Sequence, residues 1–111
     1  MTDHPLDRLF ATIIARQTAG HAAHSYTAKL LQAGVARCAK KFGEESVEAV
    51  IAAMEKDKAA LASESADVLY HLAVLWAASG VTPDQVYAVL KARESQSGLE
   101  EKAARPAQDI A

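Results

Sequence analysis

Three glutamates fall within one short stretch of the chain and could act together on a cation. They are Glu44, Glu45 and Glu48. On an α-helix successive residues are rotated by about 100°, so the three carboxylates would span an arc of roughly 100°. A solvated acidic face is the alternative, because Lys40 and Lys41 stand at i,i+4 to Glu44 and Glu45 and would support it. Taken alone, this group leaves metal binding and plain surface charge both open.

Two more carboxylates, Glu64 and Asp67, lie one helical turn apart beside a strongly apolar segment. Residues 68–76 read VLYHLAVLW. A helix that is apolar nearly all round is expected at the centre of a bundle. Carboxylates on such a helix need a cationic partner, because burying an unpaired charge is costly. That partner is either a metal ion or a basic side chain in a buried salt bridge.

The two acidic groups together place five carboxylates on two helices that a short turn joins. Such helices pack antiparallel, so the groups can face each other across one cleft. Crowded carboxylates disfavour their own ionised state. A hard divalent cation relieves this, and all-oxygen ligation favours Mg²⁺ or Mn²⁺, of which Mg²⁺ also accepts substrate phosphates as ligands. The sequence therefore predicts phosphate chemistry at a metal site made of Glu44, Glu45, Glu48, Glu64 and Asp67.

The order and spacing of these acids resemble the EExxE…ExxD pattern of the all-helical nucleoside-polyphosphate pyrophosphohydrolases. Here the pattern reads EESVE at 44–48 and ESAD at 64–67. Other segments resemble one family of that superfamily, the phosphoribosyl-ATP pyrophosphohydrolases: SYTAKLL at 25–31, KFGEE at 41–45, DVLYHL at 67–72 and SGLEEK at 97–102. The resemblance runs from about residue 6 to residue 105. Nothing in the chain resembles the cyclohydrolase to which this enzyme is fused in some organisms.

The resemblance implies an enzyme that hydrolyses phosphoribosyl-ATP to phosphoribosyl-AMP and pyrophosphate, the second step of histidine biosynthesis. It implies that the five acids are catalytic and hold Mg²⁺ on the triphosphate, where the metal helps to form the attacking hydroxide. In an alternative mechanism, one of these acids acts as the base that removes a proton from the attacking water, and the sequence leaves open which one. Substrate binding is assigned to Lys29, Lys41, Thr27, Lys102 and Arg105.

The basic candidates differ in how the sequence supports them. Lys29 and Lys41 lie in family-like segments, whereas an ordinary surface lysine is an equally good interpretation of Lys40. Lys102 and Arg105 lie in the family-like tail, which could close over the site from a second subunit and pair the phosphoribosyl phosphate. A merely solvated tail is the alternative.

Histidine and cysteine carry weaker signals. His71 follows Asp67 by one turn, and we expect a hydrogen-bonded core residue there, with orientation of a carboxylate as the alternative. His21 and His24 form an HxxH pair with no third ligand at useful spacing, so we do not expect zinc. Cys38 is interpreted as a small helix residue.

Helical periodicity covers most of the chain and predicts an all-α fold, a compact bundle of four to five helices. The expected helices begin near Pro5 and then cover 26–33, about 35–56 and about 58–79, with a last helix from Pro83 and a polar tail at 95–111. Their expected caps are Ser25, Asp57 and Thr82, the last forming a capping box with Gln85. Their expected buried faces include Val35, Ala39, Val47, Val50, Ile51 and Met54 on the long helix and Val86, Val89 and Leu90 on the last.

Length and composition bound the remaining possibilities. The 111 residues suffice for one domain, 1–111. With 12 basic and 14 acidic residues the net charge is −2, which does not favour nucleic acid as a partner. We see no signal peptide or membrane-spanning stretch, and a lone cysteine fits a reducing compartment, so we expect a soluble, cytoplasmic protein. Broad apolar stripes on so small a bundle predict self-association as a homodimer or a higher even oligomer.

Three rival functions fit part of the sequence. A house-cleaning pyrophosphohydrolase acting on a free nucleoside triphosphate such as dUTP would use the same acids. A di-iron bundle would need Glu-x-x-His on two helices, whereas His71 follows Asp67 by four residues and no second such pair is present. A non-catalytic helical dimerisation module explains the apolar stripes but leaves Glu64 and Asp67 without a role.

Overall fold

The computed structural model describes residues 4–20 and 25–94. The described residues form helices and short connections, with no strand among them, which confirms the all-α prediction. The helices are α1 (Pro5–Ala19), α2 (Tyr26–Ala33), α3 (Val35–Met54), α4 (Lys58–Ser79) and α5 (Pro83–Arg93). The tail predicted at 95–111 lies outside the described residues.

Side-chain caps start the helices where the sequence predicts them. The hydroxyl of Ser25 accepts the amide N–H of Ala28, and Asp57 accepts that of Ala60 at 2.9 Å. Thr82 and Gln85 form the expected capping box at the start of α5. Each cap satisfies amides that the first turn of a helix leaves without a partner, so the helix starts are set locally.

The connection between α3 and α4 differs from the prediction. The long helix was expected to continue to about residue 56, but α3 ends at Met54. Lys56 adopts a left-handed conformation, with φ at 59°, and breaks the helix before Asp57 caps α4. A left-handed lysine carries no sequence signature comparable to that of Gly34 or Gly80, whose positive φ values end α2 and α4.

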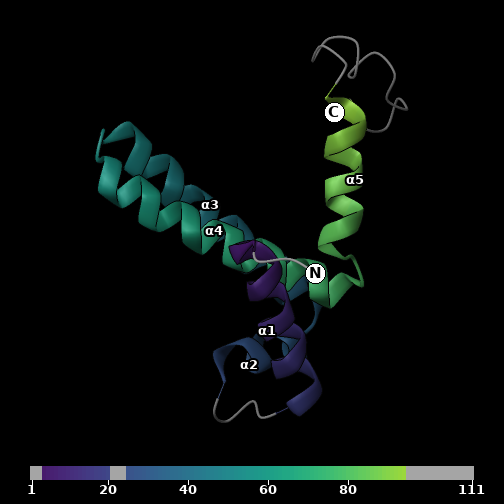
Figure 1. Cartoon of the computed structure of the whole chain (residues 1–111). Coiled ribbons are helices and arrows are strands. Elements are labelled where there is room, and N and C mark those ends of the chain that lie inside the picture. Colours follow the sequence, from purple (N-terminus) through teal and green to yellow (C-terminus); the bar gives the residue numbers. More distant parts are fainter. Residues whose placement is uncertain (1–3, 21–24, 95–111) are drawn as a thin grey trace.

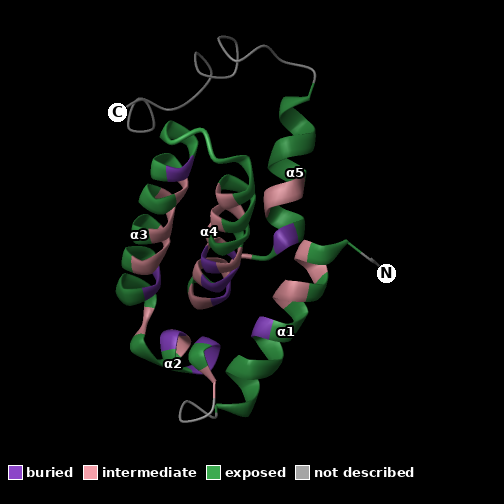
Figure 2. Ribbon diagram, turned by 90° about the vertical axis from the view of Figure 1, so that its left-hand side faces the viewer, coloured by how far each residue is buried: buried purple, intermediate pink, exposed green. Residues whose placement is uncertain are grey.

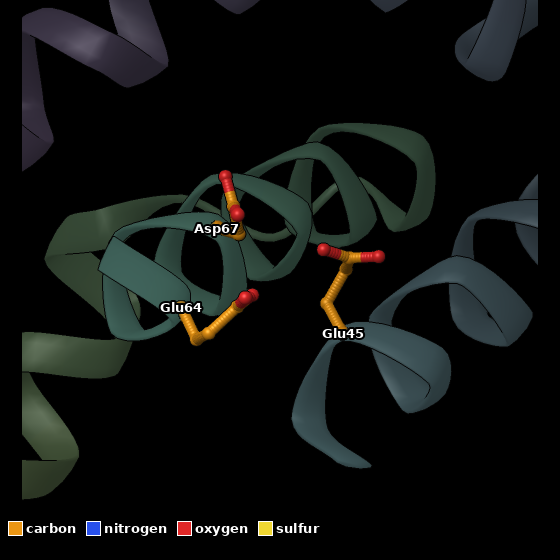
Figure 3. Close-up of side chains that lie close together, drawn as sticks. All are labelled: Glu45, Glu64 and Asp67. Atoms are coloured by element: carbon orange, nitrogen blue, oxygen red, sulfur yellow. The ribbon is translucent and has the colours of Figure 1, made fainter. Parts of the chain in front are cut away.

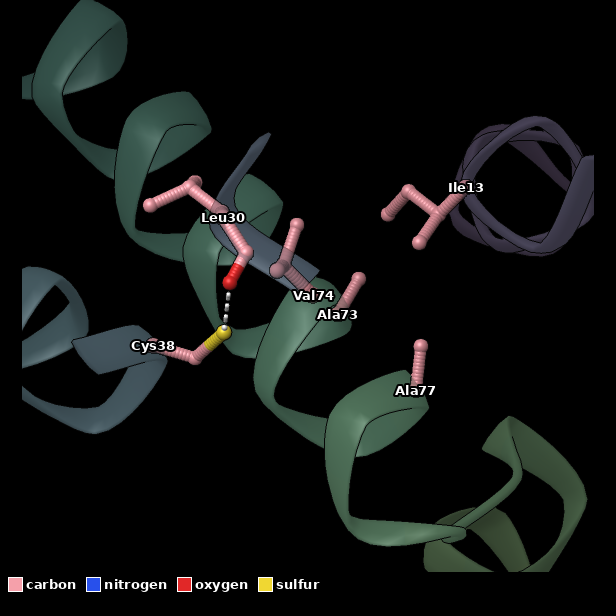
Figure 4. Packing of buried hydrophobic residues seen from close by; sticks show 6 residues of the cluster. All are labelled: Ile13, Leu30, Cys38, Ala73, Val74 and Ala77. Carbon is pink, nitrogen blue, oxygen red and sulfur yellow. Dashed lines mark hydrogen bonds between the residues drawn. The ribbon is translucent and has the colours of Figure 1, made fainter. Parts of the chain in front are cut away.

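The helices α3 and α4 lie side by side as a long antiparallel hairpin, and α1 and α2 pack near the end where α3 begins and α4 finishes (Figure 1). The core lies at this end (Figure 4) and comprises Ile13, Leu30, Cys38, Ala73, Val74 and Ala77. Within it the thiol of Cys38 donates a hydrogen bond to the carbonyl oxygen of Leu30 at 3.3 Å. The cysteine is 1% exposed, so its interpretation as a small core residue of a helix is confirmed.

The buried face predicted for α3 is wrong. Its apolar stripe is open on the described chain, with Val50 60% and Met54 76% exposed (Figure 2). The protected residues of α3 instead include Cys38, Phe42, Glu45, Ala49 and Ala52, which recur at alternating spacings of four and three. That spacing forms a seam along one helix face, as in two-helix packing. Packing against α4 protects only one face of α3, so the stripe on the far side has no cover among residues 4–20 and 25–94.

The buried face predicted for α5 is also largely open. Val89 is 48% and Leu90 57% exposed, and only Val86 is partly covered. The helix extends away from the α3–α4 hairpin beyond Pro83 (Figure 1), so little of the described chain covers its apolar residues. No helix of the described part of the chain has the length and apolar character needed to cross a membrane.

Candidate active site

Three of the five predicted carboxylates converge between α3 and α4. One ligand oxygen from each of Glu45, Glu64 and Asp67 lies within 4.8 Å of the other two. Glu45 comes from α3, and Glu64 and Asp67 come from α4, one turn apart (Figure 3). The short turn that ends at Asp57 makes the hairpin antiparallel and thereby brings these distant sequence positions together.

The seam explains why two of these acids meet. Glu45 belongs to the protected positions of α3, and Glu64 lies one turn before the half-buried Val68 of α4. Both glutamates are partly buried, whereas Asp67 stands at the exposed edge. Glu64 is therefore only partly buried and Asp67 is exposed, although α4 is the central helix that packs against α1, α2 and α3. The α4 residues near these acids face solvent on one side, and Leu69 is 45% exposed.

The electrostatics of this group favour a bound cation. Partial burial raises the pKa of Glu64, and the negative charges of Asp67, Glu48 and Glu45 raise it further. In the described part of the chain, no lysine or arginine forms an ion pair with the three converging carboxylates. The donor set is entirely carboxylate oxygen, which suits a hard divalent cation such as Mg²⁺ or Mn²⁺. These residues therefore fit a metal of the predicted kind.

The other two predicted acids lie beside this group. Glu44 is exposed and forms an ion pair with Lys41, whose Nζ lies 3.3 Å from its carboxylate oxygen. That hydrogen bond raises the pKa of Lys41, the negative charges of Glu44 and Glu45 also raise it, and desolvation lowers it. Glu48 is exposed but close enough to raise the pKa of Glu64. Both glutamates thus add negative charge at the rim.

A basic pocket of about 390 Å³ adjoins the acidic group along α3. Its lining comes from α2 and α3 and consists of Tyr26, Lys29, Leu30, Ala33, Arg37 and Lys41. Lys29 and Lys41 were predicted as substrate residues, and the structure places both at this pocket. Arg37 was missed, although its i,i+4 spacing to Lys41 puts it on the same helix face and could have indicated it.

A hydrogen-bonded network fixes the wall of this pocket. Nδ1 of His71 lies 2.8 Å from the carbonyl oxygen of Asp67 and must donate, because a carbonyl only accepts. In the neutral imidazole, Nε2 is then left to accept from the Tyr26 hydroxyl at 3.3 Å. His71 is 6% exposed, so the predicted role as a hydrogen-bonded core histidine is confirmed. It links the backbone at Asp67 to the aromatic wall of the pocket.

Thr27, which was also predicted to bind substrate, is not part of the lining of this pocket. Its side chain is 8% exposed, and its hydroxyl shares a hydrogen bond with the hydroxyl of Tyr70 instead of lining the pocket. The predicted substrate residues Lys102 and Arg105, and the HxxH pair of His21 and His24, lie outside the described residues.

An all-helical chain whose carboxylates converge between two antiparallel helices has the features expected of a metal-dependent nucleotide pyrophosphohydrolase. The family model for phosphoribosyl-ATP pyrophosphohydrolase matches residues 6–94. The chain belongs to this family, and it is a hydrolase.

Curated relatives agree with the family match over most of the chain. The chain is 60% identical to a phosphoribosyl-ATP pyrophosphatase of Parvibaculum lavamentivorans over 100 residues, which cover 90% of this chain and 91% of that protein. It is 57% identical to the enzyme of that name from Azospirillum brasilense, with 90% and 89% covered. A third, from Cereibacter sphaeroides, is 58% identical, with 90% and 96% covered.

Proposed function

We propose that this chain hydrolyses phosphoribosyl-ATP to phosphoribosyl-AMP and pyrophosphate, the second step of histidine biosynthesis. Its family and the names of its relatives support the substrate. The observation that carries the chemistry is the convergence of Glu45, Glu64 and Asp67, whose oxygens lie within 4.8 Å of one another. A cation bound between these three side chains would offset the repulsion of their negative charges.

The cation we propose is Mg²⁺ or Mn²⁺. Glu45, Glu64 and Asp67 would hold it, and Glu44 and Glu48 complete the acidic surroundings. When bound, such a metal neutralises charge on the triphosphate and lowers the pKa of water. The family resemblance and the crowding of like charges both support this assignment.

The residues of the chain perform the remaining tasks. A water oxygen attacks the α-phosphorus, the bond from that phosphorus to the oxygen bridging to the β-phosphorus breaks, and pyrophosphate leaves. A carboxylate of the acidic group accepts the proton of the attacking water. Lys41, held by Glu44 at 3.3 Å, lies between the acids and the basic pocket, where its positive charge can pair with substrate phosphate.

The assay that tests this function measures pyrophosphate release. We expect rapid release from phosphoribosyl-ATP with Mg²⁺, much slower release from ATP or dUTP, and none when EDTA removes the metal. Glu64→Ala should lose activity, whereas Glu55→Ala, a matched removal of an exposed glutamate at the end of α3, should retain it. A preference for ATP or dUTP would replace the proposal with the house-cleaning function.

We further propose that two copies of the chain associate through the open face of α3. The apolar stripe there includes Val47, Val50, Ile51 and Met54, between 45% and 76% exposed. A contiguous apolar face of this kind is unusual on a monomer. We expect a homodimer or a higher even oligomer in sedimentation, and Val50→Glu should shift it toward monomer. A wild-type monomer at micromolar concentration would contradict this.

A further inference from the structure

The basic pocket between α2 and α3 brings three cations to one concave surface. Lys29, Arg37 and Lys41 all line its volume of about 390 Å³. Among the described residues Lys41 is paired with Glu44, whereas Lys29 and Arg37 form no ion pair. Like charges that converge around a hollow repel one another. An anion in the pocket would attract all three cations and so offset their mutual repulsion.

The position of Arg37 separates it from the acidic group. Glu45 follows Arg37 by eight positions along α3, a rise of about 12 Å at 1.5 Å per residue. Lys41 stands halfway, about 6 Å from either on the same scale. A metal at Glu45 and an anion at Arg37 would therefore occupy opposite ends of this row of side chains. A ligand that reaches both ends needs negative charge at two separated positions.

Phosphoribosyl-ATP has two such groups. Its triphosphate stands at one end, and the 5′-phosphate of the phosphoribosyl group stands at the other, with the purine between them. We propose that the pocket binds this remote 5′-phosphate and that Arg37 is the specificity-determining residue; the inference rests on the proposed function. ATP carries the triphosphate and lacks the remote phosphate, so this contact distinguishes the two nucleotides.

The chemistry of the lining assigns the main contact to Arg37. A guanidinium presents a planar fork of donors that matches two phosphate oxygens at once. Lys41 already forms an ion pair with Glu44, and Lys29 contributes a single positive charge from α2. Tyr26, 52% exposed and held through its hydroxyl by His71, offers an aromatic wall against which a ribose can lie. The wall is thus fixed before the ligand binds.

The test compares Arg37→Ala with Lys40→Ala. Lys40 lies on the same helix, is exposed and does not line the pocket, so its removal controls for net charge. A lost hydrogen bond to a charged group predicts a fall of about 10- to 100-fold in kcat/KM for phosphoribosyl-ATP with Arg37→Ala. The inhibition constant of ATP should change less than about threefold, because ATP has no group for this pocket. Lys40→Ala should resemble wild type in both measurements.

A binding measurement without metal separates this inference from the proposed function. In EDTA, titration calorimetry should detect ribose 5-phosphate on the wild type, competed by inorganic phosphate, and weaker binding by about tenfold or more on Arg37→Ala. If Arg37→Ala weakens ATP and phosphoribosyl-ATP equally, the pocket takes the triphosphate and the inference is wrong. Unchanged kinetics and binding would also overturn it. If the wild type releases no pyrophosphate from phosphoribosyl-ATP, the proposed function fails, and the ribose 5-phosphate titration alone decides what the pocket binds.

Discussion

The hydrogen bond between Thr27 and Tyr70 joins α2 to α4 beneath the basic pocket. The Thr27 side chain is 8% exposed, and Tyr70 is partly buried. Burial raises the pKa of Tyr70 above its usual 10.0, so the phenol is protonated at neutral pH and can donate or accept in this bond. We predict that this pair stabilises the fold and that Tyr70→Phe and Thr27→Val are coupled in a double-mutant cycle.

The expected magnitudes follow from what each substitution leaves behind. Tyr70→Phe leaves the buried Thr27 hydroxyl without its partner, which should lower the free energy of unfolding by about 1–2 kcal/mol. Thr27→Val leaves the phenol of Tyr70, which is less buried and can reach water, so the loss should be about 1 kcal/mol. The double variant removes both polar groups and should lose about 1 kcal/mol less than the sum of the single losses.

Urea unfolding monitored by circular dichroism measures these energies, with Thr18→Val as control. Thr18 is exposed, and its hydroxyl bonds only to the Ile14 carbonyl of its own helix, so its loss should be about 0.5 kcal/mol or less. Additive single losses would refute the coupling. Thr27→Val should also keep kcat/KM within about threefold of wild type. If Thr27→Val lost much activity without losing stability, the result would support the prediction that Thr27 binds substrate.

Three further predictions concern charge and backbone. Mg²⁺ at 100 times its dissociation constant should raise the free energy of unfolding by about 2.7 kcal/mol, as measured by thermal unfolding. Asp67→Asn should abolish this stabilisation by Mg²⁺. If the stabilisation persists in Asp67→Asn, the metal binds elsewhere. Without metal, the raised pKa of Glu64 means that the native state holds its proton more tightly than the unfolded chain. The stabilisation that protonated Glu64 gives the native state is therefore complete below pH 4.5 and is lost as pH rises through the higher native pKa. Over that pH range the free energy of unfolding should fall less for metal-free Glu64→Gln than for the metal-free wild type. Lys56→Gly should stabilise the fold by about 0.5–1 kcal/mol in urea unfolding, because the left-handed φ of 59° is strained for lysine. This net gain is reduced by the larger chain entropy that glycine loses on folding. Lys56→Ala should bring no such gain, because alanine keeps the strain.

The helix starts were predictable because their causes are local. Ser25, Asp57 and Thr82 each accept the amide N–H three positions along the chain, so a short sequence window contains both partners. The end of α3 was not predictable in this way. Lys56 adopts its left-handed conformation where the amide N–H of Asp57 donates to the carbonyl oxygen of Ala52 at 3.3 Å, and lysine gives no residue-type signal for that conformation.

Burial was predicted less well, because periodicity identifies an apolar face without identifying its cover. The stripe that contains Val50 and Met54 was expected in the core, yet it faces outward on the single chain. The seam is made largely of small or polar residues such as Ala49 and Ala52, which a hydrophobicity pattern ranks below valine and methionine. Small residues permit close approach of two helices, so a seam of this kind can be buried without a pronounced apolar pattern.

The carboxylates were found from residue type and spacing, whereas Arg37 was missed. Acids at i,i+3 and i,i+4 are visible within one helix, and the hairpin geometry needed to join Glu45 to Glu64 follows from a short turn. The basic pocket depends on how α2 packs against α3, because Lys29 and Arg37 belong to different helices. The i,i+4 spacing of Arg37 and Lys41 indicates one shared face of α3, but nothing in either helix alone indicates that Lys29 joins them.

Three faces of α3 therefore have three different tasks. The seam that contains Glu45 meets α4 and brings the acids together, the surface that contains Arg37 and Lys41 meets α2 and forms the basic pocket, and the stripe that contains Val50 and Met54 remains open. A helix with 3.6 residues per turn has room for all three only if each is narrow. Small seam residues keep the α4 contact narrow. The open stripe consequently runs beside the acidic group, so a second copy seated on it would lie close to the site and could limit its access to water.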